Sequence, residues 1–139
     1  MNRLELRQLA EDRILDAAAL LAAGRYSGAY YLAGYAVECG LKACILAYIE
    51  RTGFIFQDRK YAEKCWTHEL KALLVLADLD KEFEQTQGVN RNLEGNWDVA
   101  KAWEETSRYQ QKTQLEAQKL YDAIETGPDG VLSWIRLRW

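Results

Sequence analysis

Proline is nearly absent from this sequence, and its absence bears directly on the fold class. The only proline is Pro128. Because a proline inside a helix removes a backbone hydrogen bond and clashes with the preceding turn, a chain without one is free to be helical. No segment shows the sustained alternation of branched or aromatic residues that is typical of a strand. The sequence therefore predicts an all-α protein.

Cysteine and histidine are also scarce. The three cysteines, Cys39, Cys44 and Cys65, form no C-x-x-C pair, and His68 is the only histidine. An odd number of cysteines argues against a disulfide framework, and the spacing does not suit a zinc site. We interpret Cys39 and Cys44 as small apolar packing residues, and we expect no metal and no cofactor.

Long apolar runs are missing as well. The longest run, residues 14–23, is too short to cross a bilayer, and Glu5 precedes any apolar run. Apolar residues make up 49% of the sequence and charged residues 28%, the balance of a globular protein, and 139 residues are the usual length of one domain. We expect a single cytoplasmic domain spanning residues 1–139, with no membrane contact.

Positive charge is not in excess, since the formal net charge is −3. Proteins that bind nucleic acids gain much of their affinity from lysines and arginines that neutralise phosphates. The composition therefore does not favour a general nucleic-acid binder. We expect no DNA binding, and any contact with RNA would be local.

Apolar periodicity divides the chain into four main helices and a packed C-terminal tail. The first helix is predicted over about residues 2–23 and the second over about 26–51, each followed by a glycine that suits a helix end. Thr67 suits the N-cap of a third helix, which we expect to fray in the polar stretch 85–95.

The remaining segments are predicted from breaks in this pattern. A charged, aromatic loop should run to Trp66, and a break is expected over residues 104–114, where apolar periodicity is almost lost. A fourth helix follows, with Leu115 near its start and Gly127 at its end. Pro128 then suits the first turn of a short final helix.

The second predicted helix is rich in glycine, at Gly28, Gly34 and Gly40. A glycine inside a helix costs about 1 kcal/mol relative to alanine, so three in one helix need a reason. We expect that a neighbouring backbone approaches this helix closely.

Glu38 and Lys42 stand four residues apart on the same helix. The spacing suits a surface ion pair worth about 0.2–0.5 kcal/mol. Their neighbours are small or apolar, however, which favours burial of at least one of the two charges, and a buried charge needs a partner. Arg108 is the candidate partner. The three residues would then either fix the packing of the helices or line a site for a small anion.

Three stretches of this sequence carry a resemblance to a known family. Residues 30–43 read YYLAGYAVECGLKA, residues 107–109 read SRY, and residues 130–135 read GVLSWI. In this order the chain resembles the HEPN superfamily of bacterial and archaeal helical domains. The resemblance implies an antiparallel four-helix bundle, homodimerisation, and a role in toxin–antitoxin or phage-defence pairs beside a minimal nucleotidyltransferase.

Many HEPN proteins are metal-independent ribonucleases with an arginine and a histidine separated by a spacer of four to six residues, near the start of the third helix. His68 occupies the place of the histidine. The three positions that the signature allows for the arginine hold other residues: Tyr61, Ala62 and Glu63. Arg59 lies too far upstream and Lys64 too close.

Three functions follow from these observations. The preferred one is a HEPN-like protein that acts through a homodimer and a cognate antitoxin partner. The second is a ribonuclease in which His68 moves a proton and Lys64, Arg59 or Arg108 replaces the missing arginine. The third is a site for a nucleotide or small anion near Glu38, Lys42 and Arg108. A purely structural role is also open for His68, as a hydrogen-bonding residue of its own first turn or as a neighbour of Trp66.

Overall fold

The computed structural model of this protein describes residues 1–53 and 58–139, and these residues contain helices and no strand. The all-α prediction is confirmed for them. The helices are α1 (Arg3–Ala22), α2 (Tyr26–Thr52), α3 (Arg59–Lys64), α4 (Leu70–Leu76), α5 (Asp80–Val89), α6 (Arg91–Ala100), the 3-10 helix η2 (Glu105–Tyr109), α7 (Gln114–Glu125) and α8 (Val131–Arg136).

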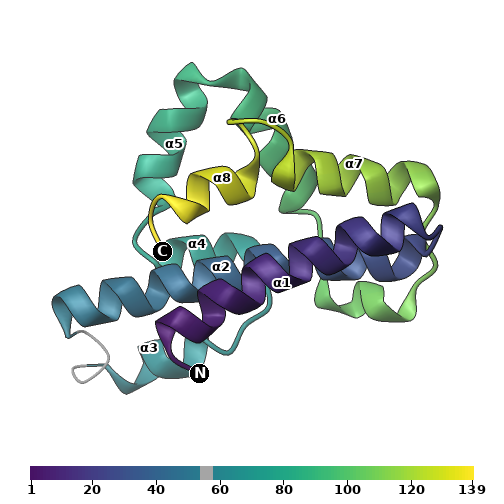
Figure 1. Cartoon of the computed structure of the whole chain (residues 1–139). Helices are drawn as coiled ribbons and strands as arrows, with labels where there is room; N and C mark the ends of the chain where they lie inside the picture. Colours follow the sequence, from purple (N-terminus) through teal and green to yellow (C-terminus); the bar gives the residue numbers. More distant parts are fainter. Residues whose placement is uncertain (54–57) are drawn as a thin grey trace.

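Helices α1 and α2 form an antiparallel hairpin that runs the length of the molecule (Figure 1). The side chain of Asn2 caps α1 by accepting from the Glu5 backbone N–H at 2.8 Å. Gly24 (φ +73°) and Gly53 (φ +66°) follow the two helices in the left-handed conformation that glycine tolerates. Both helices thus match their predicted bounds to within one residue.

Helix α7 packs against α1 and α2 and starts at the end of the molecule where the α1–α2 turn lies (Figure 1). The backbone N–H of Lys112, just before α7, donates to Ser27 Oγ at 2.9 Å and ties these two ends together. Thr113 and Glu116 cap α7 reciprocally. Pro128 lies before α8 rather than in its first turn, because α8 begins only at Val131.

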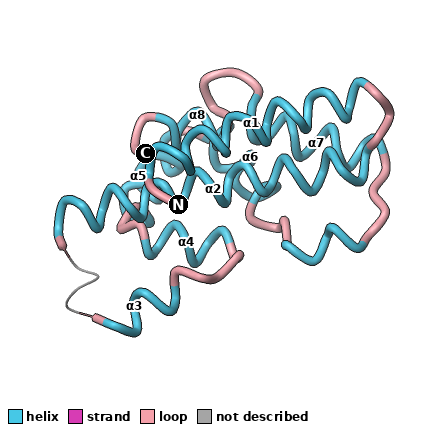
Figure 2. The backbone as a smooth tube through the Cα atoms, turned by 60° about the horizontal axis from the view of Figure 1, so that its bottom comes forward, coloured by secondary structure: helices cyan, strands magenta, loops and turns pink. Residues whose placement is uncertain are grey.

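The middle of the chain differs from the prediction. Helix α3 lies within the predicted loop, of which residues 54–57 lie outside the described part of the chain. Helix α4 begins at Leu70, later than the predicted cap; Thr67 Oγ1 accepts from the Glu69 backbone N–H at 3.2 Å, just before the helix. Figure 2 shows α4 beside α2, on the side away from α1. The predicted break over residues 104–114 is confirmed, and η2 interrupts it.

The polar stretch 85–95 is helical rather than frayed, and that prediction was wrong. Asn90 Oδ1 accepts from the Leu93 backbone N–H at 3.1 Å and starts α6 directly after α5. Only a few apolar side chains of α5 and α6 are buried, but these include the large rings of Phe83 and Trp97. The Phe83 ring lies 5.1 Å from the ring of Trp97 and 4.9 Å from that of Trp134, centroid to centroid. Such aromatic anchors fix short helices without a long apolar stripe.

Helix α2 is the central element of the core, and its glycines accept side chains rather than a backbone. A Cβ on Gly34 would lie closer than 3.0 Å to three atoms of the Trp103 indole ring. A Cβ on Gly40 would meet Ile135 Cγ2 at 3.0 Å. A Cβ on Gly28 would meet Leu20 Cδ1 at 3.2 Å. The expected close approach therefore exists, but its partners are the side chains of a tryptophan, an isoleucine and a leucine, so the expected backbone contact was wrong.

By length and composition alone, α2 is also the one described helix that could cross a membrane. However, 61% of its most apolar window is buried inside the protein, as in the core helix of many soluble proteins. This burial explains the apolar composition of α2 without a membrane.

Candidate functional site

A buried carboxylate stands at the centre of the candidate site. Glu38 on α2 is 1% exposed. Its Oε1 atom accepts from Lys42 Nζ at 2.9 Å and from His68 Nδ1 at 2.8 Å. Its Oε2 atom is buried and has no hydrogen-bond partner among the described residues. A buried carboxylate with charged or polar partners is stable only because those partners replace its hydration.

The three side chains come from two segments of the chain. Glu38 and Lys42 lie one turn apart on α2, so their side chains meet on one side of the helix. His68 lies between α3 and α4, and its side chain is 51% exposed. A carboxylate oxygen can only accept a hydrogen bond, so a neutral imidazole in this contact carries its proton on Nδ1. The lone pair of Nε2 is then available to a ligand. The cluster therefore presents an oriented histidine at the surface.

The structure brings Glu38 and Lys42 together as predicted, and it buries Glu38. Arg108 does not join them, so the predicted partner was wrong. Its guanidinium pairs with Glu105 Oε1 at 3.0 Å and lies 4.8 Å from the Tyr109 ring centroid. Both partners belong to η2, which holds Arg108 beside the start of α2 instead of beside its middle. His68 takes the place that was expected for Arg108.

The hydrogen bond of His68 reaches Glu38, not its own first turn, and sequence reasoning missed this pairing. The two residues are thirty positions apart, so no local spacing could reveal it. The available signal was indirect: a charge in an apolar helix needed a partner, and the sequence contains only one histidine.

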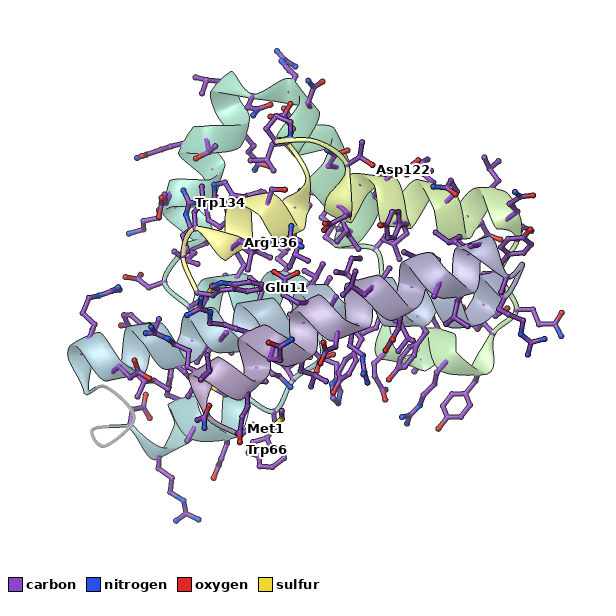
Figure 3. All side chains as sticks on the ribbon, in the orientation of Figure 1. Met1, Glu11, Trp66, Asp122, Trp134 and Arg136 are labelled. Carbon is purple, nitrogen blue, oxygen red and sulfur yellow. The ribbon has the colours of Figure 1, made fainter. Side chains whose placement is uncertain are left out.

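An apolar groove of about 400 Å³ adjoins this cluster. Glu38 and Lys42 form its polar part, and the rest is largely apolar, with Leu6, Ile45 and Ile49 among the lining residues. Trp66 stands at the groove with 82% of its surface exposed, and Met1 is 74% exposed. Figure 3 shows Trp66 and Met1 next to each other. We call this surface the Trp66 groove.

The positions of the ribonuclease signature do not supply a guanidinium. Tyr61 is buried, and its hydroxyl donates to the Leu76 carbonyl oxygen. Glu63 is exposed and pairs with Arg59 Nε at 3.5 Å along α3. Lys64 is exposed at the end of α3 and lines a shallow hollow with Thr67 and other residues of α3 and α4. Among the described residues, His68 hydrogen-bonds to Glu38 alone.

The buried cysteines behave as packing residues, as predicted. Burial raises the pKa of Cys39 to about 11 and that of Cys44 to about 12. Both thiols are therefore neutral near pH 7 and are poor nucleophiles. Within the described ranges, no group of three or more histidine, cysteine, aspartate or glutamate side chains could hold a metal ion.

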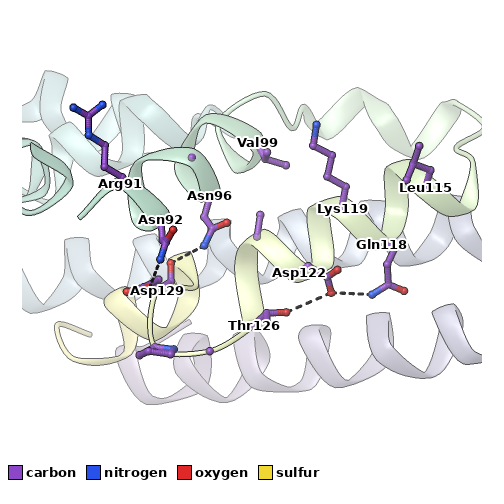
Figure 4. Close-up of a pocket in the computed structure, with 14 residues that line it drawn as sticks. Arg91, Asn92, Asn96, Val99, Leu115, Gln118, Lys119, Asp122, Thr126 and Asp129 are labelled. Carbon is purple, nitrogen blue, oxygen red and sulfur yellow. Dashed lines mark hydrogen bonds between the residues drawn. The ribbon is translucent and has the colours of Figure 1, made fainter. Parts of the chain in front are cut away.

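A larger hollow lies between α6 and α7 (Figure 4). Asp129 anchors it: its carboxylate accepts from Asn90 Nδ2 at 2.8 Å and from Asn92 Nδ2 at 3.2 Å, and these two bonds lower its pKa. Asn96 Nδ2 donates to the Asp129 carbonyl oxygen at 2.9 Å. The amides thus hold the loop before α8 onto α6, which explains this polar cluster structurally.

Comparisons with protein-family models, with curated proteins and with solved structures found no match.

Proposed function

We propose that this chain is a HEPN-like helical protein of the cytoplasm that acts through protein contacts. It forms a homodimer and binds a cognate partner, such as a minimal nucleotidyltransferase, in a toxin–antitoxin or defence setting. In this proposal α1, α2, α4 and α7 are the counterparts of the four helices of the HEPN bundle. The resemblance over residues 30–43 supports the setting, and the Trp66 groove supports the homodimer.

The exposure of Trp66 carries the homodimer proposal. A tryptophan gains more from burial than almost any other residue, and large exposed apolar rings mark interaction surfaces. Here a protruding ring and an apolar groove lie on the same face. In a two-fold symmetric dimer the same patch serves both subunits, so each Trp66 ring would enter the groove of the other copy.

The mass of the protein in solution tests this proposal. We expect a dimer for the wild type by light scattering after size-exclusion chromatography. Replacing Trp66 by serine should weaken self-association at least about ten-fold, because the loss of one buried ring exceeds about 1.4 kcal/mol. Val89→Ser is the matched control, since Val89 is 89% exposed on α5 and is not among the residues that line the groove.

Thermal unfolding of each variant shows whether it still folds, and both substitutions are at exposed positions. A monomeric wild type at high concentration would contradict the homodimer. So would a Trp66→Ser variant that dimerises as tightly as Val89→Ser.

The contact between Glu38 and His68 favours a second function, metal-independent cleavage of RNA. His68 Nε2 would take the proton of a ribose 2′-hydroxyl, and the 2′-oxygen would form a bond to phosphorus. The bond from phosphorus to the 5′-oxygen would break, the leaving oxygen would take up a proton from solvent water, and a 2′,3′-cyclic phosphate would remain. Lys42 donates a hydrogen bond to the same carboxylate oxygen as His68 and is a further candidate for the cation of this site.

Labelled RNAs incubated with the protein in EDTA test this second function. Wild type should cleave, His68→Ala should not, and Glu38→Gln should retain part of the activity because glutamine still offers an oxygen to Nδ1. Lys42→Gln, Lys64→Gln, Arg59→Gln and Arg108→Gln would identify the cation that replaces the signature arginine. Full activity of His68→Ala would exclude this histidine as the catalytic base.

A further inference from the structure

A third hollow, of about 630 Å³, lies at the end of the molecule where α1 turns into α2. The segments that line it are residues 24–28, at this turn, and residues 108–112, between η2 and α7, together with Leu20. Figure 1 shows the α1–α2 turn, the 3-10 segment and the start of α7 gathered at the same end of the chain. We call it the Arg25 hollow.

The charge of this hollow sets it apart. Its lining includes Arg25, Arg108 and Lys112 and no acidic residue. The hollows on α6–α7, on α3–α4 and at the Trp66 groove each have at least one acidic side chain in their lining, and so does a further hollow lined by α4, α5 and α6. A concave surface lined by positive charges without negative ones raises the local concentration of anions.

The cations keep hydrogen-bond donors free for a ligand. Arg108 forms an ion pair with Glu105 Oε1 through one of its guanidinium nitrogens, at 3.0 Å, whereas a guanidinium has five N–H groups. Lys112 Nζ lies 4.5 Å from the Tyr30 ring centroid and 3.8 Å from Glu116 Oε2, a long ion pair. Arg25 is exposed and has no ion pair among the described residues. Glu105 and Glu116 therefore pair with Arg108 and Lys112 but are not among the residues that line the hollow.

The backbone adds to this charge. The 27-residue helix α2 begins here, and its N-cap residue Arg25 makes no side-chain hydrogen bond to the first turn. The free N–H groups and the positive end of the helix dipole favour an anion. The bond from the Lys112 backbone N–H to Ser27 Oγ joins the two walls, so the hollow is formed before any ligand enters.

Aromatic rings flank the cations. Tyr26 and Tyr109 both line the hollow, and Tyr109 is 78% exposed. The Arg108 guanidinium covers one side of the Tyr109 ring at 4.8 Å and leaves the ring accessible. A nucleobase stacks on such a ring with a gain of about 1–3 kcal/mol.

We propose that the Arg25 hollow binds a nucleoside phosphate, with the phosphate on Arg25, Arg108 and Lys112 and the base against Tyr109. This assignment explains why Arg108 lies away from Glu38: the anion site predicted at the middle of α2 lies at its start instead. Glu38 lies twelve residues after Tyr26, the first residue of α2, which is roughly 18 Å along the helix. The inference does not depend on the function proposed above.

Calorimetric titration with AMP, ATP, inorganic phosphate and a 5′-phosphorylated RNA hexamer tests the proposal. We expect AMP or the hexamer to bind, and the affinity to fall as salt is raised. Arg25→Gln combined with Arg108→Gln should raise Kd at least about ten-fold, a loss of about 1.4 kcal/mol. Arg91→Gln, an exposed arginine of the α6–α7 hollow, is the matched control and should leave Kd unchanged.

Tyr109→Ser separates the two halves of the site. It should weaken AMP binding and leave inorganic phosphate binding unchanged, because phosphate has no ring to stack. Tighter binding of AMP identifies a free nucleotide as the ligand, and tighter binding of the hexamer identifies an RNA end; both support the site. No heat with any probe at millimolar concentration would overturn the proposal, as would equal weakening by Arg91→Gln. An unchanged AMP affinity in Tyr109→Ser would overturn the assignment to a nucleoside.

Discussion

Gly34 and Glu38 lie one turn apart on the same side of α2, yet their surroundings are opposite. At Gly34 the indole of Trp103 fills all the space that a side chain would need. At Glu38 a carboxylate is held by Lys42 and His68 beside an open groove. Within one turn, the helix changes from a packed contact to a polar site.

This difference teaches how to interpret residues that do not suit a core helix. A glycine costs helix stability, and a buried charge costs hydration. The glycine is explained by the ring that replaces its side chain, which is a packing reason. The charge is explained by a half-exposed histidine that it orients, which is a chemical reason as well as a packing one. Substitutions at the two positions should therefore fail in different ways.

The largest effect is expected for Gly34→Ala. The new Cβ would overlap the Trp103 ring, which is 2% exposed and has no room to withdraw. Overpacking typically costs about 1–3 kcal/mol, and this overlap is severe, so the gain of about 1 kcal/mol in helix propensity should not offset it. We expect the free energy of unfolding in urea to fall by about 3 kcal/mol.

The double variant Gly34→Ala with Trp103→Leu is the control for this prediction. Trp103→Leu alone should destabilise the protein, because it leaves a cavity. In the double variant the new methyl group occupies part of that cavity, so the two effects should be less than additive. Additive effects would show that the indole is not what excludes a side chain at position 34.

A smaller loss is expected for Glu38→Ala. The substitution removes two charge-assisted hydrogen bonds, but Lys42 and His68 are partly exposed and can turn to water. We expect the free energy of unfolding to fall by about 2 kcal/mol for Glu38→Ala. It should fall by about 1 kcal/mol for Glu38→Gln, because glutamine keeps a hydrogen-bond acceptor. In the NMR spectrum of the imidazole, Glu38→Ala should also remove the preference for the Nδ1–H tautomer. An unchanged spectrum would contradict the geometry of the site.

The sequence predicted the local features of this helix better than its tertiary contacts. The hairpin of α1 and α2 and the helix α7 were predictable because caps, stop glycines and apolar periodicity are local signals. The pair of Glu38 and Lys42 was predictable for the same reason, since its spacing is that of one helical turn. The ring against Gly34, the bond from His68 and the position of Arg108 depend on tertiary packing. Helices α5 and α6 escaped prediction because a few large rings hold them.

A near-zero effect is expected for Gly40→Ala, on the opposite side of α2. Its Cβ would meet Ile135 Cγ2 at 3.0 Å, with Leu132 and Trp139 atoms at 3.4 Å, and these side-chain ends can shift. A packing cost of about 1 kcal/mol and a propensity gain of about 1 kcal/mol then nearly cancel. A loss near that of Gly34→Ala would show that the contact with α8 is as rigid as the contact with Trp103.

The smallest perturbation needs no substitution and reports on the groove beside Glu38. Cys65 and Cys39 both line the Trp66 groove, whereas Cys44 is not among its lining residues. Burial raises the pKa of all three thiols, to about 11 for Cys39 and about 12 for Cys44. At pH 8 these two are almost wholly protonated and therefore unreactive, while Cys65 is only half-buried.

A disulfide reagent at pH 8 should therefore label Cys65 before the two buried thiols of the folded chain, and all three equally only in denaturant. Peptide mapping by mass spectrometry identifies the labelled position. If Cys39 reacted as fast as Cys65 while Cys44 stayed protected, the groove would open down to α2 itself, and the polar site at Glu38 would then be reached by solvent far more easily than the packed turn at Gly34.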